Sequence, residues 1–409
     1  MALGTSGCRL KASIALRDWP RSIARARRWH PLLAGAALLA PGMASAQESE
    51  PEASIGATYT TDILSNLRGG VARKARQMGK LDITGQVKGS VFGIDALSLH
   101  ADVQLIHGGG FSDEAAGDAQ VVSNIDAPAG LRPLQAYAAM RFGPGGAGVI
   151  KAGLVDLNSD FDVQEVGAFF INASHGIGPD FSQSGVNGPS IFPTTASAVT
   201  MEWAGQGWTA RVGLFDAVAG DVDRPRRTVI RFPGESGALL VGEVDIAIDR
   251  VGVQLGGWSY TGRFDAIEQD NPGSRRQIPA NRGLYGLIEG SLVKGTDRSL
   301  DAWARIGAAN SAINPIGLYL GGGLTYRNGR NHVGLALGHA RLGDASIRAG
   351  AASGARPGRA ETVIEVSFRH QLSDRLAVQP DVQYVIDPHW DPSRGNALVA
   401  GMRLQFTLF

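Results

Sequence analysis

The sequence has 409 residues, with 39 Lys and Arg, 38 Asp and Glu, 56 Gly and one cysteine. The charges nearly balance, so there is no basic excess of the kind that binds nucleic acid. A single cysteine excludes an intramolecular disulfide and a zinc site built from several cysteines. The many glycines favour strands and turns, because glycine weakens helices.

The first 46 residues have the layout of a secretory signal peptide. A cationic segment (21–28) precedes a short apolar run (32–40) and a small-residue sequence (44–46). The alternative is an N-terminal membrane anchor, but a spanning helix needs an apolar run of about 20 residues, and the run over 32–40 is much shorter. We therefore predict a signal peptide over 1–46. Its cleavage removes seven basic residues, one acidic residue and the only cysteine, which leaves a mildly acidic, thiol-free chain.

Short segments that alternate apolar and polar residues follow along the rest of the chain, the signature of half-buried strands. Val244 and Ile246, for example, share one face, while Glu243 and Asp245 share the other. No linker or shift in composition divides residues 47–409, so we expect one large β architecture. The predicted strands are 55–61, 81–91, 97–105, 134–142, 149–155, 199–204, 208–214, 240–248, 251–260, 284–292, 300–307, 316–326, 333–339, 362–368, 376–386 and 398–408.

The connections between these sixteen strands alternate in length. The short turns include 205–206, 249–250, 327–330 and 373–375, and the long links include 107–133, 156–197, 217–236, 261–281 and 342–359. Short periplasmic turns and long extracellular loops are typical of outer-membrane barrels. We therefore predict an all-β fold, a sixteen-stranded antiparallel transmembrane β-barrel.

The link over 156–197 is far longer than an ordinary connection, and links of this length are usually functional or disordered. It contains five phenylalanines, whose apolar surface argues against disorder. We predict an ordered constriction loop that folds into the barrel and narrows the pore. Its candidate functional residues are Asp156, Asp160, Asp162, His175 and Asp180.

Four runs carry a resemblance to a known family. They are DAQVVSNIDAP (118–128), GLVDLNSDFD (153–162), FINASHGIGPDFSQSGVNGPSIFP (170–193) and QPDVQYVIDPHWDPSRGNALVAGMRLQFTLF (379–409). The chain resembles the carbohydrate-selective porins of Gram-negative outer membranes, the OprB-type family. The resemblance implies a constricted sixteen-stranded barrel for passive sugar uptake. Small sugars, outer-membrane lipid and the outer-membrane assembly machinery are the implied partners, and the oligomeric state, monomer or trimer, stays open.

The polar face of the strands mixes both signs of charge. An anion channel would line its wall with one sign, so mixed charge favours a neutral, hydroxyl-rich solute held by hydrogen bonds. The alternative is that opposite charges simply neutralise one another across the lumen. The candidate channel-lining residues are Asp82, Lys88, His100, Asp102, Glu202, Arg211, Glu243, Asp245, Trp258, Glu289, Asp301, Trp303, Arg305, Asp381 and Arg403.

Two rival functions remain open from the sequence. An outer-membrane enzyme would use His100 or His175 as a base, and an adhesive barrel would bind an external partner through its loops. Ser98, His100 and Asp102 are suitable types for a catalytic triad, but their spacing on one strand sets them in a row. His175 has no second His or Cys at ligand spacing. We therefore expect no catalytic residue, no metal site and no cofactor.

Overall fold

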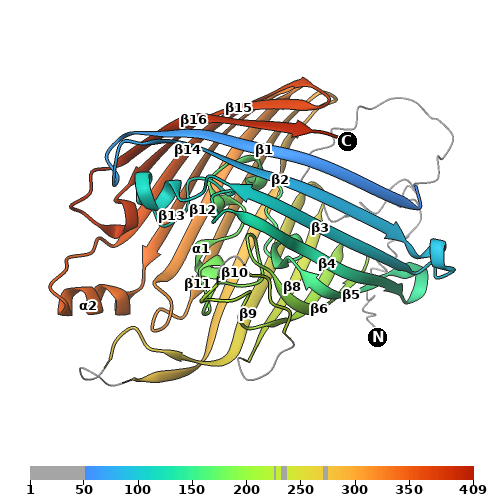
Figure 1. Ribbon diagram of the computed structural model, residues 1–409, viewed down its shortest axis with the longest axis horizontal. Helices are drawn as coiled ribbons and strands as arrows, with labels where there is room; N and C mark the ends of the chain where they lie inside the picture. Colours follow the sequence, from blue (N-terminus) through green and yellow to red (C-terminus); the bar gives the residue numbers. More distant parts are fainter. Residues whose placement is uncertain (1–50, 225–226, 232–236, 270–274) are drawn as a thin grey trace, which may run out of the picture.

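The computed structural model describes residues 51–224, 227–231, 237–269 and 275–409, which form a closed barrel (Figure 1). Within these residues sixteen antiparallel strands follow one another in chain order, and β1 pairs with β16 to close the barrel. The predicted sixteen-stranded antiparallel barrel is confirmed. The predicted signal peptide (1–46) lies outside the described residues. No helix in the described part is long and apolar enough to cross a membrane.

The strands are β1 (Ala53–Arg68), β2 (Ala75–Lys88), β3 (Leu97–His107), β4 (Gly130–Phe142), β5 (Gly148–Val155), β6 (Ala196–Ala204), β7 (Trp208–Asp216), β8 (Ala238–Ile248), β9 (Val251–Asp265), β10 (Gln277–Lys294), β11 (Arg298–Ala309), β12 (Ile316–Asn328), β13 (Asn331–Leu342), β14 (Ala360–Ser373), β15 (Leu376–Ile386) and β16 (Ala397–Thr407). Two short α-helices, α1 (Pro179–Ser182) and α2 (Asp344–Ala352), lie in the connections.

The outer face of the barrel is apolar and the inner face is polar. On β8 the outward Leu240 and Val244 are 48% and 42% exposed, whereas the inward Glu243 is 3% exposed. Apolar side chains are stable in this position because lipid, and not water, surrounds a transmembrane barrel. Closure also satisfies the backbone hydrogen bonds of every strand, which a bilayer requires.

Several strands begin before their predicted starts. β2 begins at Ala75 and β10 at Gln277, six and seven residues before the alternating runs at 81 and 284. The long link predicted over 261–281 is therefore mostly a hairpin, in which Gln277 pairs with Asp265. The hairpin continues beyond the sixteen-stranded wall, and its sequence does not show the regular alternation on which the prediction depended. Figure 1 shows the β9–β10 hairpin bending away from the barrel.

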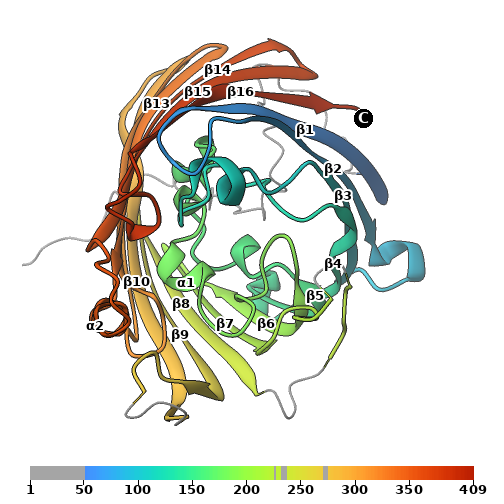
Figure 2. The same cartoon turned by 60° about the vertical axis from the view of Figure 1, so that its left-hand side comes forward.

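Two of the long connections fold into the barrel (Figure 2). We call residues 108–129, between β3 and β4, the first inner loop, and residues 156–195, between β5 and β6, the constriction loop. Their backbones are joined by hydrogen bonds from Asn124 N to Ile171 O (2.8 Å) and from Ala173 N to Val121 O (2.9 Å). The predicted constriction loop thus lies inside the barrel with a second segment that the sequence did not place there.

Candidate functional site: the loop-lined lumen

The constriction loop runs along the inner wall from β8 to β15 and returns to β5. On its outward path it contacts Glu243 of β8 and Gln254 of β9, and it then reaches Gln383 of β15 through Asn172. On its return, Ser190 Oγ donates to the carbonyl of Val155 at the end of β5 (2.6 Å). The loop therefore covers one side of the lumen wall.

Glutamates of the inner wall hold the loop backbones. Glu289 accepts hydrogen bonds from the N–H groups of Glu165 (3.2 Å) and Val166 (2.9 Å). Glu365 accepts from Ile171 (2.6 Å) and Asn172 (3.0 Å). Carboxylates form strong hydrogen bonds with backbone donors, so each pair fixes a short loop segment on the wall.

The first inner loop is held in the same way. Glu361 of β14 accepts hydrogen bonds from the backbone N–H groups of Ala119 (2.8 Å) and Gln120 (2.9 Å). Ser123 Oγ donates to Asp62 of β1 (2.6 Å), which links this loop to the place where the barrel closes. Both inner loops are thus attached through wall carboxylates.

A buried ion cluster joins the constriction loop to β11. Arg305 Nε and Nη2 donate to the two carboxylate oxygens of Asp162 (2.8 and 2.7 Å), and Arg305 Nη1 donates to Asp180 (2.7 Å). All three side chains are fully buried. Buried charge is costly unless it is paired, and the planar guanidinium pairs here with two carboxylates at once. A Cβ on Gly307 would lie 2.1 Å from Asp180, so the cluster needs a glycine at this point of β11.

His175 of the constriction loop is fully buried, as a neutral ring, between the loop and the barrel wall. Burial lowers its pKa to about 3, so it carries no charge at neutral pH. The ring lies edge-on to Trp303 and to Phe170, with centroid distances of 5.5 and 5.4 Å. The contact between His175 and Trp303 thus packs the constriction loop against β11.

The constriction loop leaves part of the inner wall exposed. In this part, β2 and β5 carry charged side chains of both signs. Lys80 and Asp82 of β2 form an ion pair (3.0 Å), with side chains 20% and 16% exposed. Gln104 of β3 donates to Asp82 (2.6 Å). Lys151 of β5 reaches across to Asp160 of the constriction loop (2.5 Å).

Flat side chains lie beside these charges. Lys151 Nζ sits 5.3 Å from the centre of the Tyr137 ring of β4, and His100 of β3 stacks on the same ring at 4.8 Å. Lys80 Nζ lies 5.4 Å from the Phe192 ring of the constriction loop. The lumen therefore presents donors, acceptors and ring faces within one region.

Comparison with known proteins decides what this barrel is. The family model for carbohydrate-selective porins of the OprB family matches residues 72–408. The chain belongs to the OprB family. As a member, it is a carbohydrate-selective porin, a channel for passive diffusion of sugars, and the family and fold place it in the outer membrane of a Gram-negative bacterium.

Solved OprB and porin structures share the fold. A high-pH structure of Pseudomonas putida OprB superposes with a TM-score of 0.76 at 17% identity, over 87% of this chain and 94% of that chain. A low-pH structure of the same protein gives 0.54 at 13% identity, over 87% and 93%. A Rhodopseudomonas blastica porin variant gives 0.51 at 11% identity, over 87% and 100%. No curated protein sequence matches the chain.

The candidate channel-lining residues fall into two groups on the inner wall of this OprB member. In the first group are side chains that are largely buried, mostly beneath the loops: Arg211, Glu243, Trp258, Glu289, Trp303, Arg305 and Asp381. The second group contains the remaining candidates, which also lie on the inner face and, apart from Asp102, are partly exposed: Asp82, Lys88, His100, Asp102, Glu202, Asp245, Asp301 and Arg403. Of these, Asp102 is only 8% exposed, and Arg403 pairs with Asp62 (2.7 Å).

The candidate residues of the constriction loop divide similarly. Asp162, His175 and Asp180 are buried in its anchoring contacts, whereas Asp156 and Asp160 are partly exposed. Sequence reasoning missed Lys80, Tyr137 and Glu361 as candidates. Lys80 of β2 and Glu361 of β14 occupy positions that alternate with apolar residues on their strands. This alternation could have identified both residues as inward-facing.

No group of three or more His, Cys, Asp and Glu side chains suited to a metal occurs within the described ranges.

Proposed function

We propose that sugars cross the barrel between the constriction loop and the wall formed by β2 to β7. The observation that carries this proposal is the Lys151–Asp160 ion pair (2.5 Å), which joins that wall to the loop next to Tyr137. Its side chains stay 12% and 10% exposed. Ammonium and carboxylate groups exchange hydrogen bonds with sugar hydroxyls, and a ring face accommodates the apolar face of a sugar.

The test is sugar-dependent block of ionic current through the purified barrel in a planar lipid bilayer. The double variant Lys151→Gln/Asp160→Asn leaves the net charge unchanged but removes both charged hydrogen-bonding groups. We expect the sugar affinity in the block to fall about tenfold, since a hydrogen bond to a charged group contributes about 1.5–3 kcal/mol.

The matched control is the extracellular pair Arg348–Glu268 (2.6 Å). Arg348→Gln/Glu268→Gln also keeps the net charge and is expected to leave the block unchanged. Unaltered block in the Lys151/Asp160 variant, with normal barrel assembly, would place the sugar path elsewhere in the lumen.

We also propose that the barrel acts without a catalytic step. His100 Nε2 lies 3.1 Å from Ser98 Oγ, but among the described residues no carboxylate hydrogen-bonds to the His100 ring to complete a triad, and the ring stacks on Tyr137. His175 is fully buried within the constriction loop, away from any solute in the lumen. Steady ohmic conductance supports the channel. Hydrolysis of glycoside or ester substrates that is lost in His100→Ala would support the enzyme instead.

The remaining proposals concern export and assembly. We infer that residues 1–46 are a cleaved signal peptide, that residues 47–409 form one barrel domain, and that the assembly machinery of the outer membrane inserts it. The intact mass of the protein purified from outer membranes tests the first point, because cleavage after Ala46 predicts a chain that starts at Gln47. A mass that includes the leader would contradict it.

A further inference from the structure

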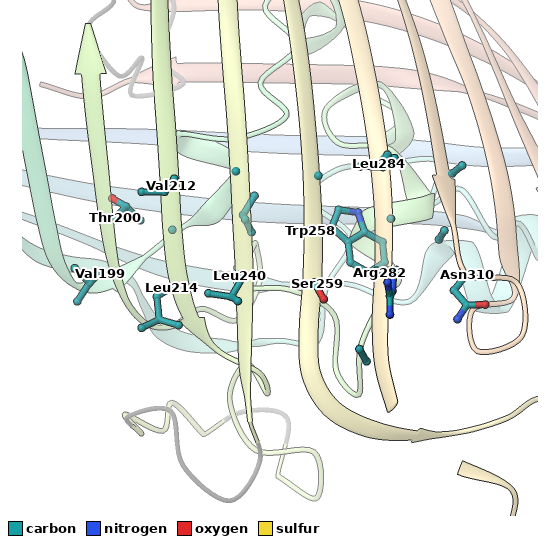
Figure 3. A pocket seen from close by; sticks show the side chains of 18 of the residues that line it. Val199, Thr200, Val212, Leu214, Leu240, Trp258, Ser259, Arg282, Leu284 and Asn310 are labelled. Carbon is teal, nitrogen blue, oxygen red and sulfur yellow. The ribbon is translucent and has the colours of Figure 1, made fainter. Parts of the chain in front are cut away.

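A hollow of about 1210 Å³ lies along the strands β5 to β11 (Figure 3). Outward-facing side chains form much of its lining. A lateral row of paired residues crosses it, from Met201 through Val212, Gly242 and Gly257 to Leu284. Leu214 and Leu240, which also line the hollow, stand two residues from the ends of β7 and β8 that adjoin the long connection 217–237, so the hollow extends into the extracellular half of the barrel. Its surface there faces lipid.

Two facing glycines create the depth of this hollow. Gly242 of β8 pairs directly with Gly257 of β9, and both stand on the outer face between the larger Val212 and Leu284. A Cβ on Gly242 would meet nothing within 4 Å. The floor is therefore open at Gly242, whereas at Gly257 the Leu284 side chain lies over the glycine, 2.7 Å from where a Cβ would stand.

Over β9 to β11 the extracellular edge of the hollow is polar and cationic, whereas over β6 to β8 it is formed by Val199, Leu214 and Leu240. Two residues further along each strand, at the next outward position, Leu240 pairs with Ser259 and Ser259 pairs with Arg282. The backbone N–H of Asn310 donates to the carbonyl of Arg282 (3.0 Å). Figure 3 shows Ser259, Arg282 and Asn310 at one level, below the apolar row. The Arg282 side chain is exposed and has no carboxylate partner among the described residues.

The β9–β10 hairpin limits the hollow on the same side. Ile278, Pro279 and Ala280 line it, at the point where a register shift between Pro279 and Asn281 interrupts the β9–β10 ladder. The hollow thus has an apolar floor and bears an exposed arginine at its extracellular edge. An occupant must combine hydrocarbon with negative charge at that depth.

We propose that this groove binds a phosphorylated, multiply acylated glycolipid of the outer leaflet. Its acyl chains lie on the open floor at Gly242 and against Leu284, and a phosphate accepts hydrogen bonds from Arg282, whose guanidinium matches phosphate oxygens. A second copy of the barrel fits less well. A two-fold arrangement would set one hollow against the other and bring two Arg282 side chains together.

The experiment uses the mature barrel in phosphatidylcholine nanodiscs that contain either diphosphoryl lipid A or fully dephosphorylated lipid A, with retained lipid counted by native mass spectrometry. The wild type is expected to retain the diphosphoryl form about tenfold better, as lost charge-assisted hydrogen bonds predict. Arg282→Gln is expected to abolish this preference. Gly242→Leu, which fills open space, is expected to lower retention of both forms.

The matched control is Arg341→Gln. Arg341 also faces outward near the extracellular end of its strand, β13, but it already pairs with Asp344 (3.3 Å). Equal retention of the two lipids by the wild type would overturn the proposal, as would the same loss of preference in Arg341→Gln. Efficient cross-linking of two barrels through Leu240→Cys would assign the groove to a second copy and would also overturn it.

Discussion

Arg305 of β11 holds both carboxylate oxygens of Asp162, a residue 143 positions earlier in the chain, at 2.8 and 2.7 Å. The guanidinium lies between the rings of Tyr285 and Tyr319, at 5.4 and 5.6 Å from their centres. This contact and the one with Asp180 fix the constriction loop against the wall opposite the proposed sugar path. Arg305 is therefore a positioning residue for the channel.

Arg305→Gln is expected to release the constriction loop. The substitution leaves two buried carboxylates without their cation, which costs about 3–5 kcal/mol in other proteins. The barrel is expected to assemble still, because its strands satisfy one another. Single-channel recordings are expected to show altered mean conductance and larger current fluctuations, whereas Arg341→Gln is expected to behave as the wild type. Wild-type recordings for Arg305→Gln would show that the loop does not depend on this cluster.

Cysteine labelling tests whether the loop covers the inner wall. Ala336 of β13 is 1% exposed and packs with Phe170 and Trp303 beneath the loop. In membranes, Ser98→Cys on the partly exposed inner face of β3 is expected to react with a polar thiol reagent. Ala336→Cys and the lipid-facing Leu337→Cys are expected to stay unreactive.

Deleting residues 163–192 separates the two causes of protection. We expect Ala336→Cys to become reactive because its cover is gone, and Leu337→Cys to stay protected by lipid. If Ala336→Cys in the full-length barrel reacted as fast as Ser98→Cys, the constriction loop would not cover Ala336, which would contradict the structure.

Single substitutions at the Lys151–Asp160 pair are expected to shift ion selectivity in opposite directions. Lys151→Gln removes a positive charge from the lumen and is expected to raise the preference for cations, while Asp160→Asn is expected to raise the preference for anions. Reversal potentials in a salt gradient measure both. Shifts of the same sign would show that the two side chains do not act on one path.

The docking of the first inner loop is expected to weaken as pH rises. Burial and the nearby Glu361 raise the pKa of Asp118 to about 8. Because the docked state favours the protonated acid, its stability falls as pH rises from about 4, the usual value, to about 8. Hydrogen exchange over 110–126, corrected for intrinsic rates, is expected to be faster at pH 8.5 than at pH 5. Asp118→Asn is expected to reduce this difference, and an unchanged pH dependence in the variant would contradict the role of Asp118.

The number of strands could be predicted from the sequence, as could the face of side chains in regular stretches of strand, although register shifts such as the one between Ser291 and Val293 interrupt the period. Alternation on β8 places Val244 outward and Glu243 inward, and the same period holds around the barrel because pleated strands turn successive side chains to opposite faces. Strand ends were predicted less well. The β9–β10 hairpin continues past the membrane, where neither face requires apolar residues.

Only the tertiary structure decided which inward side chains line the lumen and which are sealed. Trp303 and Arg305 share the inward parity that Asp82 also has, yet the first two lie beneath the constriction loop and Asp82 stays partly exposed. Likewise, Glu361 holds the backbone of Ala119 across a separation of 242 residues. The two-residue period indicates only which face of the sheet a side chain is on. The contacts that bury Trp303, Arg305 and Glu361 join segments far apart in the chain, and these segments meet only when the barrel closes around its loops.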